Sequence, residues 1–283
     1  MKKDVDEANS VSLSQKRLSI NTNWPEIYEY VKSYPYKGLI DIAIDEKIAF
    51  VVNCMNDDAI ALQYLWTGGR LTEPVSINVW RKLARRSRTT LDIGAYTGFY
   101  ALIAASVSSV PIYSYEPVSF IYARLAENVM LNGFSNVKFI NKAVSDRIGT
   151  VEIGIRFGPQ LFSSGSSISP EMVNKAAYSQ PTHTVTVDSE HRDEKVDLIK
   201  IDVEGAEESV LKGAMALLTN SKPILLLETR SSSHAACMSI IDSLGYKSQS
   251  IEDSGGARNS IIYHPSSHLY SELTNLGFAE NAS

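Results

Sequence analysis

LDIGAYTGFY, residues 91–100, runs from an apolar strand through a glycine-containing loop into a helix. Such a turn brings backbone amides and a helix N-terminus close to a ligand. Gly94 and Gly98 enclose three residues and no third glycine follows, whereas the dinucleotide fingerprint GxGxxG has three. Asp92 places a carboxylate just before the turn, which suits a cationic ligand better than a diphosphate. S-adenosylmethionine, which carries a sulfonium and an ammonium, fits this pattern better than a nicotinamide dinucleotide does.

Downstream of residue 88, short apolar runs alternate with amphipathic stretches. This alternation is typical of repeated βα units around a parallel sheet, so we predict an α/β fold. The expected strands are 89–93, 111–116, 137–141, 196–202 and 223–228. The expected helices lie near 98–106, 118–131, 206–218 and 234–244.

Two further pairs of β-rich runs predict hairpins. Residues 246–251 and 259–264 are joined by a segment too short for a crossover helix, so we expect an antiparallel C-terminal hairpin. Residues 150–155 and 182–187 bracket a loop, 156–170, that is rich in Ser and Gly. We expect an inserted hairpin at that point.

The N-terminal part of the chain lacks this alternation. Residues 1–20 are polar and Ser-rich, so we expect a flexible tail. Residues 21–88 read as a helical cap or interface segment, with Asn56 to Asp58 capping one helix, and residues 89–283 read as the cofactor-binding domain. The aromatic side chains of the N-terminal segment are typical of a core, with a substrate cover or an oligomer interface as alternatives. They are Trp24, Tyr28, Tyr30, Tyr34, Tyr36, Phe50, Tyr64, Trp66 and Trp80.

Composition argues against several classes of partner. A chain of 283 residues with 44% hydrophobic content can bury a large core. Its net charge of -5 does not favour nucleic acid, and we read the basic cluster Arg81, Lys82, Arg85, Arg86 and Arg88 as a solvated helix face. Cys54 and Cys237 lie far apart, which indicates neither a zinc site nor a disulfide. No signal peptide or membrane-spanning run is evident, so we expect a cytoplasmic protein without a membrane partner.

Glu116 closes the second expected strand as Asp92 closes the first. Both carboxylates then fall at the C-terminal edge of adjacent strands, where an acid can accept hydrogen bonds from ribose hydroxyls. The alternative for Glu116 is an exposed strand-end carboxylate. The end of the third strand, Asn141 to Val144, would border the adenine.

LIKIDVEGAE, residues 198–207, indicates a reactive cleft. A central strand buried on both faces should be apolar, yet this one carries Lys200, Asp202 and Glu204 on one face. These charges must pair with one another or face a wet cleft at the strand end. For Lys200 the alternative is an ion pair without a chemical role.

A hydroxyl acceptor must lose a proton during methyl transfer, so the site should contain a base. Asp202 is the first candidate for an orienting or base role, and Glu204 and Glu228 are alternatives. Of the histidines, His234 follows a central strand, although a surface position at a helix start is the ordinary interpretation; His183, His191, His264 and His268 read as peripheral. No metal, NTPase or serine-hydrolase motif occurs, and we expect no metal.

Several segments resemble the FkbM family of S-adenosylmethionine-dependent methyltransferases: DIGAYTGFY (92–100), YEP (115–117), AVSDRIGTVE (143–152), IKIDVEGAE (199–207) and VLKGA (210–214). The resemblance implies a class I, Rossmann-like fold with a mostly parallel seven-stranded sheet. It also implies cofactor contacts at Asp92, Gly94, Gly98 and Glu116. The implied reaction is O-methylation of a sugar or of a polyketide- or peptide-derived natural product. At Tyr96 the family commonly has Asn, so an aromatic ring there would pack on the cofactor or narrow the pocket.

The sequence thus predicts a methyltransferase that uses S-adenosylmethionine and a small-molecule acceptor. N-methylation, a non-catalytic cofactor-binding protein of the same fold, and assembly into a homo-oligomer remain open. The candidate cofactor-binding residues are Asp92, Gly94, Tyr96, Thr97, Gly98, Phe99, Glu116, Pro117, Asn141, Ala143 and Val144. The candidate catalytic residues are Asp202, Glu204, Lys200, Glu228 and His234. Acceptor specificity should reside in the N-terminal segment and in the 156–181 loop.

Overall fold

The computed structural model describes residues 24–70, 73–156, 162, 165–176, 178–254 and 256–279. The predicted tail, residues 1–20, lies outside the described residues, as do parts of the Ser-rich loop.

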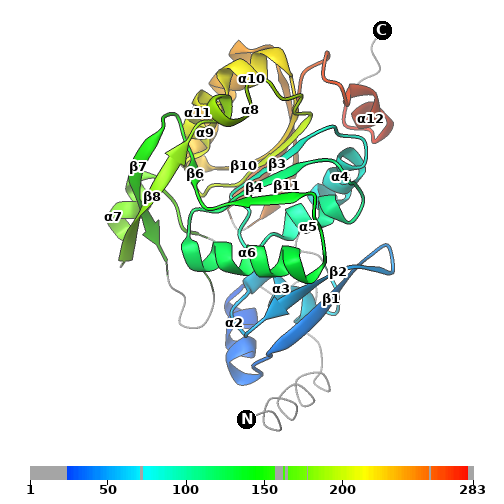
Figure 1. The fold of residues 1–283 in the computed structure, drawn as a ribbon, viewed down its shortest axis with the longest axis vertical. Coiled ribbons are helices and arrows are strands. Elements are labelled where there is room, and N and C mark those ends of the chain that lie inside the picture. The colour runs from blue at the N-terminus through cyan, green and yellow to red at the C-terminus, as the bar shows by residue number, and fades with distance from the viewer. Residues whose placement is uncertain are drawn as a thin grey trace.

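A seven-stranded sheet with the order β11-β12-β10-β9-β3-β4-β5 forms the centre of the molecule (Figure 1). Its strands are β3 (Thr90–Ile93), β4 (Ile112–Tyr115), β5 (Val137–Ile140), β9 (Leu198–Ile201), β10 (Ile224–Arg230), β11 (Lys247–Ser254) and β12 (Ala257–Tyr263). The first five are parallel, β12 is antiparallel to β10, and β11 is antiparallel to β12. The predicted α/β fold with a mostly parallel sheet is confirmed.

The order in which the chain adds strands to the sheet reverses at β3. The chain proceeds from β3 to β4 and β5 on one side, and later adds β9 and β10 on the other side. In open α/β sheets, ligands bind beyond the carboxyl ends of the strands at such a switch point. The register places Asp92 opposite Lys200 there, so the central strands carry charge to this edge.

Helices cover both faces of the sheet. They are α4 (Pro74–Ala84), α5 (Phe99–Ala105), α6 (Ser119–Leu131), α8 (Val187–His191), α9 (Glu207–Lys212), α10 (Met215–Asn220), α11 (Ser231–Ser243) and α12 (Tyr270–Asn275). The single helix expected near 206–218 is two helices separated at Gly213. The second has its own N-terminal partner, because the Asp188 carboxylate accepts hydrogen bonds from the Ala216 and Leu217 N–H groups.

The N-terminal segment is not wholly helical, and that prediction was wrong. Between α2 (Trp24–Ser33) and α3 (Ala59–Trp66) the chain forms an antiparallel hairpin, β1 (Gly38–Ile44) and β2 (Lys47–Cys54). Its turn places Asp45 and Glu46 at positive φ, as tight hairpin turns require. The β-branched, alternating side chains of GLIDIAI bury one face of the ribbon.

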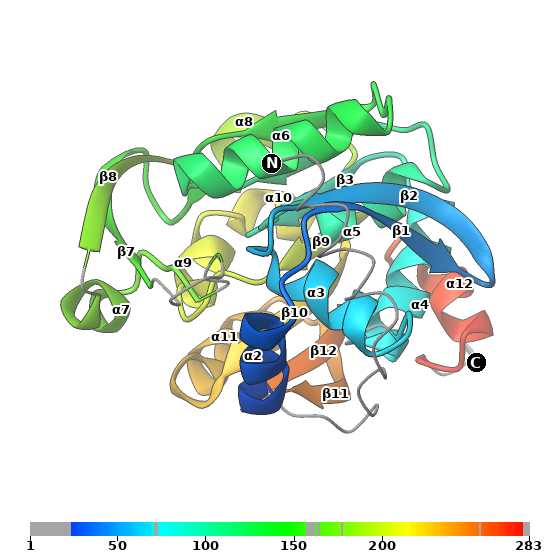
Figure 2. The ribbon, with the colours of Figure 1, turned by 90° about the horizontal axis from the view of Figure 1, so that it is seen from below.

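The hairpin packs beside α6, as Figures 1 and 2 show. The N–H groups of Val51 and Asn53 donate to the side-chain oxygens of Asn132 and Asn128 on that helix. The predicted cap of α3 is confirmed, since the Asp58 carboxylate accepts from the Ala61 N–H.

The expected inserted hairpin is present as β7 (Gly149–Ile155) and β8 (Tyr178–Val185). With β6 (Ala143–Val144) it makes a small sheet of order β6-β8-β7, and α7 (Pro170–Lys175) packs on it. The unit projects from one side of the molecule, opposite α12 (Figure 2).

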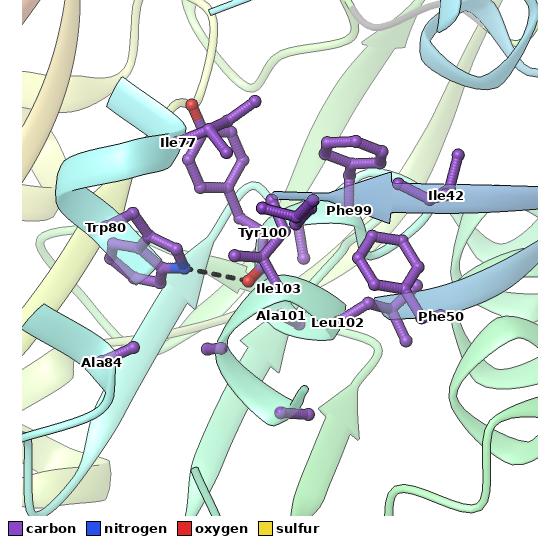
Figure 3. Close-up of a cluster of buried hydrophobic side chains, with 14 of the residues drawn as sticks. Ile42, Phe50, Ile77, Trp80, Ala84, Phe99, Tyr100, Ala101, Leu102 and Ile103 are labelled. Carbon is purple, nitrogen blue, oxygen red and sulfur yellow. Dashed lines mark hydrogen bonds between the residues drawn. The ribbon is translucent and has the colours of Figure 1, made fainter. Parts of the chain in front are cut away.

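The aromatic residues of the N-terminal segment are mostly core, as expected. Tyr36, Phe50, Trp66 and Trp80 are buried in one continuous cluster with α5. Figure 3 shows the Trp80 indole donating to the Tyr100 carbonyl oxygen, at 2.9 Å. Packing of this kind holds the N-terminal segment against the helix that follows the glycine loop.

Most of the basic cluster is engaged in ion pairs. Arg81 pairs with Asp45, Arg86 with Glu272, and Arg88 with the buried carboxylate of Asp197. Both cysteines are buried free thiols. Among the described helices, none has the length and apolar character needed to cross a membrane.

Candidate functional site

Two adjoining pockets lie at the carboxyl edge of β3, β4, β9 and β10. The empty space of the first is about 690 Å³ and that of the second about 1100 Å³, both including the part that is open to solvent. The residues that line both are Ile60, Gly94, Tyr96, Asp202 and Glu204. The glycine loop and the end of β9 therefore form the boundary between them, at the switch point of the sheet.

Close backbone packing explains the glycine at position 94. Its φ is +84°, and a Cβ built there would lie 1.8 Å from the carbonyl oxygen of Asp202. The N–H groups of Gly94 and Ala95 both donate to the carbonyl oxygen of Tyr115. These contacts clamp the loop between β4 and β9.

The first pocket is mainly apolar, and Glu116 is the acid that lines this pocket but not the second. The carboxylate of Glu116 accepts hydrogen bonds from the N–H groups of Tyr96, at 3.1 Å, and Val118, at 2.8 Å. Burial raises the pKa of Glu116 to about 8, against the opposing effect of these two donors. Its oxygens have further lone pairs, so this carboxylate can accept a hydroxyl donor from a ligand in the pocket.

The walls around Glu116 come from several elements. Ala143 and Val144 follow β5, Ile121 comes from α6, and Ile153 and Ile168 come from the insertion. Such walls suit a flat, weakly polar group. The hydroxyl of Ser166, also in this pocket, is buried without a hydrogen-bond partner in the described structure, and so offers a polar contact to a ligand.

The second pocket is strongly charged. Its acidic and basic residues are Glu73, Asp92, Lys200, Asp202, Glu204, Glu228 and Arg230. Lys200 is 3% exposed; its Nζ lies 2.8 Å from the Asp202 carboxylate and 4.4 Å from the centre of the Tyr100 ring. Burial disfavours the ammonium, but the surrounding carboxylates outweigh this and raise the pKa of Lys200. Lys200 therefore remains charged and forms an ion pair with Asp202.

Asp92 is buried beside this pair without a hydrogen bond of its own. The residue is 1% exposed, and neither of its carboxylate oxygens has a partner in full hydrogen-bonding geometry, although the nearby Ala101 N–H favours its charged form. Burial raises the pKa of Asp92 to about 7, although Lys200 opposes the shift. An unpartnered buried carboxylate that lines a pocket favours a ligand bearing a donor or a positive charge.

The remaining acids of the second pocket differ in their pairing. Glu204 forms an ion pair with Arg230, and burial raises its pKa to about 7. No described residue donates a hydrogen bond to the Glu228 carboxylate, and burial raises its pKa to about 8. Of the three candidate acids, only Glu228 has neither a cationic partner in contact nor a donor, and it is thus the most available to take up a proton.

The sequence interpretation holds for one histidine, because His234 lies at the start of α11 as the ordinary interpretation expected, and it fails for His191. His234 lines neither pocket: its Nδ1 lies 2.9 Å from the Thr229 hydroxyl, and it borders a separate cavity beyond β10. His191 was expected to be peripheral but is buried, with Nε2 2.7 Å from the Tyr115 hydroxyl. The short helix α8 places His191 against β4, and the polar residues around it in the chain did not indicate this burial.

Most of the candidate cofactor residues lie at the pockets. Gly94, Tyr96, Glu116, Pro117, Ala143 and Val144 line the first, and Asp92 and Phe99 line the second. Thr97, Gly98 and Asn141 line neither. The Asn141 side-chain amide instead donates to the carbonyl oxygens of Glu116 and Pro117, so it stabilises the backbone that follows β4.

Glu73 is a pocket residue that the sequence did not indicate. One carboxylate oxygen accepts from the Tyr100 hydroxyl and the other from the Asn259 amide. No local motif marks it, because its partners lie on α5 and β12. No cluster of three or more metal-ligating side chains occurs within the described part of the chain.

Comparison with known proteins agrees with the sequence resemblance. Residues 92–248, more than half of the chain, match the family model described as the Methyltransferase FkbM domain. A solved structure of Methyltransferase FkbM from Methylobacillus flagellatus KT is similar, with 18% identity and a TM-score of 0.48; the match covers 63% of this chain and 44% of that one. This chain therefore spans less than half of that protein.

Two other similar structures are of methyltransferases of different kinds. An O-methyltransferase from Bacillus cereus in complex with SAH has 10% identity and a TM-score of 0.41, covering 69% of this chain and 82% of that one. An rRNA methylase from Streptococcus thermophilus has 8% identity and a TM-score of 0.44, covering 67% of this chain and 93% of that one. No curated protein matches the sequence.

Proposed function

Because the chain belongs to the FkbM methyltransferase family, we propose that it transfers the methyl group of S-adenosylmethionine to a hydroxyl of a small polar molecule. A sugar, or a polyketide- or peptide-derived natural product, is the proposed acceptor class. The observation that carries this proposal is the junction of the two pockets at Gly94 and Asp202. One pocket suits a nucleoside and the other suits charged and hydrogen-bonding groups.

The residues of the first pocket and of the boundary fit the cofactor. Glu116 would accept from the ribose hydroxyls, and the apolar walls near Ala143 and Val144 would enclose the adenine. The unpartnered carboxylate of Asp92, with Asp202, would face the cationic amino-acid end. When bound, the cofactor supplies an electrophilic methyl group on a sulfonium.

We assign the proton-accepting role to Glu228 and an orienting role to Asp202. Asp202 is paired with Lys200 and Glu204 with Arg230, so an acceptor hydroxyl would compete with those cations for their oxygens, whereas Glu228 lines the same pocket without a cation in contact. A carboxylate whose pKa lies near the working pH is well matched to accept a hydroxyl proton. Glu228 would take the proton as the acceptor oxygen gains the methyl group.

The N-terminal segment, residues 21–88, is proposed to act as the substrate cover. It contributes Ile60, Glu73 and Ile77 to the second pocket. Recognition of the acceptor would thus depend on a part of the chain that lies outside the parallel sheet.

An amine acceptor is the second candidate. The second pocket holds five carboxylates, from Glu73, Asp92, Asp202, Glu204 and Glu228, against two basic groups, from Lys200 and Arg230. Such an excess of acid would attract an acceptor that carries an ammonium group. After loss of its proton the same nitrogen could take the methyl group.

Thermal unfolding with and without ligand tests the cofactor assignment. S-adenosylmethionine or S-adenosylhomocysteine at about a hundred times its Kd should stabilise the chain by ~2.7 kcal/mol, which raises the Tm by several degrees, and NAD should not. An unchanged Tm with both S-adenosylmethionine and S-adenosylhomocysteine would refute the proposal. Formation of S-adenosylhomocysteine with matched neutral sugars and aminosugars then separates O-methylation from N-methylation. Binding without turnover of any acceptor would favour a non-catalytic role.

A further inference from the structure

Tyr96 joins three segments that are distant in sequence. Its hydroxyl donates to the carbonyl oxygen of Phe162, at 2.9 Å, and accepts from the N–H of Ala59, at 3.4 Å. Phe162 belongs to the insertion and Ala59 to the N-terminal segment. One side chain of the glycine loop is therefore bonded to both elements that border the first pocket from outside the main sheet.

The Tyr96 ring lies in a small apolar cluster of its own. This cluster also contains Val118, Ile121, Ile153 and Ile155, with Ile60, Phe162 and Ile168 packed against it. It is separate from the two large cores on the faces of the sheet. Five of these residues, Ile60, Tyr96, Ile121, Ile153 and Ile168, line the first pocket, so we call the group the roof cluster.

A second set of contacts holds Phe162 on the roof cluster. Its N–H donates to the carbonyl oxygen of Asp57, and the Arg124 guanidinium lies 5.2 Å from the centre of its ring. Arg124 also makes two hydrogen bonds to the Asp57 carboxylate. The insertion and the N-terminal segment thus meet directly above α6.

The backbone conformation of Tyr96 is one that tyrosine does not favour by itself, so tertiary contacts must hold it. Its φ is +50°, a left-handed conformation that a tyrosine rarely adopts. In that conformation the Tyr96 N–H reaches the Glu116 carboxylate while the hydroxyl reaches the roof cluster. Tyr96 therefore orients Glu116, the carboxylate proposed to accept hydrogen bonds from the ribose. It also links the insertion to the N-terminal segment.

We propose that Tyr96 is a positioning residue for the cofactor, whose hydroxyl ties the N-terminal segment and the insertion over the first pocket and so slows cofactor release. This inference rests on the proposed function, because it takes the first pocket to be the cofactor site. It assigns Tyr96 no contact with the reacting atoms.

The test compares Tyr96→Phe with Tyr246→Phe in the full chain. Tyr246 is an internal control, because its buried hydroxyl also donates to one backbone carbonyl oxygen, that of Leu218, at 2.9 Å, and it lines neither of the two pockets. Each variant loses the hydrogen bond that its hydroxyl donates, so the Tm should fall by similar amounts, and slightly more in Tyr96→Phe, which also loses the 3.4 Å bond from the Ala59 N–H. The dissociation rate of S-adenosylhomocysteine, measured by rapid displacement, should rise about five- to tenfold in Tyr96→Phe alone.

Each outcome bears on the inference. Equal dissociation rates in the two variants and the unaltered chain, with S-adenosylhomocysteine bound by all three, would overturn the role of Tyr96 and leave the proposed function standing. Failure of the unaltered chain to bind S-adenosylhomocysteine would overturn both. If Tyr96→Phe does not fold, Tyr96→Asn keeps the test open, because asparagine tolerates positive φ and lacks both the ring and the hydroxyl. It should release the ligand at least as fast.

Discussion

Replacing Gly94 with alanine would drive a methyl group into the end of β9. The added Cβ would lie 1.8 Å from the Asp202 carbonyl oxygen and 2.8 Å from the carbonyl carbon. Non-bonded heavy atoms normally stay about 3.5 Å apart, so the glycine loop and the strand end would have to separate by roughly 1.5 Å. Both atoms belong to the backbone, and neither can rotate out of the way.

Two costs add in this variant. An L-residue at the observed φ of +84° costs about 1–2 kcal/mol, and forced overpacking costs about 1–3 kcal/mol more. The sum is about 2–5 kcal/mol, which for a chain of this length lowers the Tm by about 10 °C. The boundary between the two pockets moves with the loop, so S-adenosylhomocysteine should bind at least about tenfold more weakly.

Gly133→Ala is the matched control for backbone strain. Gly133 also has positive φ, +66°, but a Cβ built there would meet no atom within 4 Å. Only the conformational cost of about 1–2 kcal/mol applies, so calorimetry should show a Tm loss of about 2–5 °C and titration should show unchanged affinity for S-adenosylhomocysteine. Melting of the two alanine variants within about 2 °C of each other would refute the close approach of Gly94 to β9.

Two further predictions concern titration. Burial raises the pKa of Asp92 to about 7 and of Glu116 and Glu228 to about 8, so the ligand-free folded chain holds protons that the unfolded chain releases. The stabilisation is complete below about pH 4 and is lost as the pH rises through 7 to 8, so the Tm should fall between about pH 5 and 8; a rise over that interval would contradict the burial of these acids. Glu228→Gln should lower kcat by about a hundredfold and abolish its increase between about pH 7 and 9, whereas Glu208→Gln, on the surface of α9, should change neither. A Glu228→Gln profile parallel to that of the unaltered chain would exclude Glu228 as the base.

The parallel strands and the candidate acids were largely predictable. Each strand is a short apolar run between glycine or polar segments, and Asp92, Glu116 and Asp202 each stand at or directly after a strand end. Carboxyl ends of parallel strands meet at one edge of the sheet, so strand identity alone places these acids together. The structure does so, with Glu116 in the first pocket, Asp92 in the second, and Asp202 in both.

The N-terminal segment shows where local patterns misled. Residues 38–54 form a hairpin because their alternating face packs on α5 and α6, and tertiary packing of this kind outweighs a weak helical pattern. Glu73 became part of the site through Tyr100 and Asn259, neither of which is near it in sequence.

The sequence alone predicted the sheet, the glycine loop, the acidic strand ends and the family. Each of these features depends on residues that lie within a few positions of one another in the chain. Folding in three dimensions settled which acids are neutralised. Arg230 on β10 reaches Glu204, while Asp92 and Glu228 are buried without a cation in contact. The placement of Tyr96 beneath two distant segments belongs to the same category. Charge pairing and burial depend on distances across strands and between insertions, and no periodicity in the sequence encodes those distances.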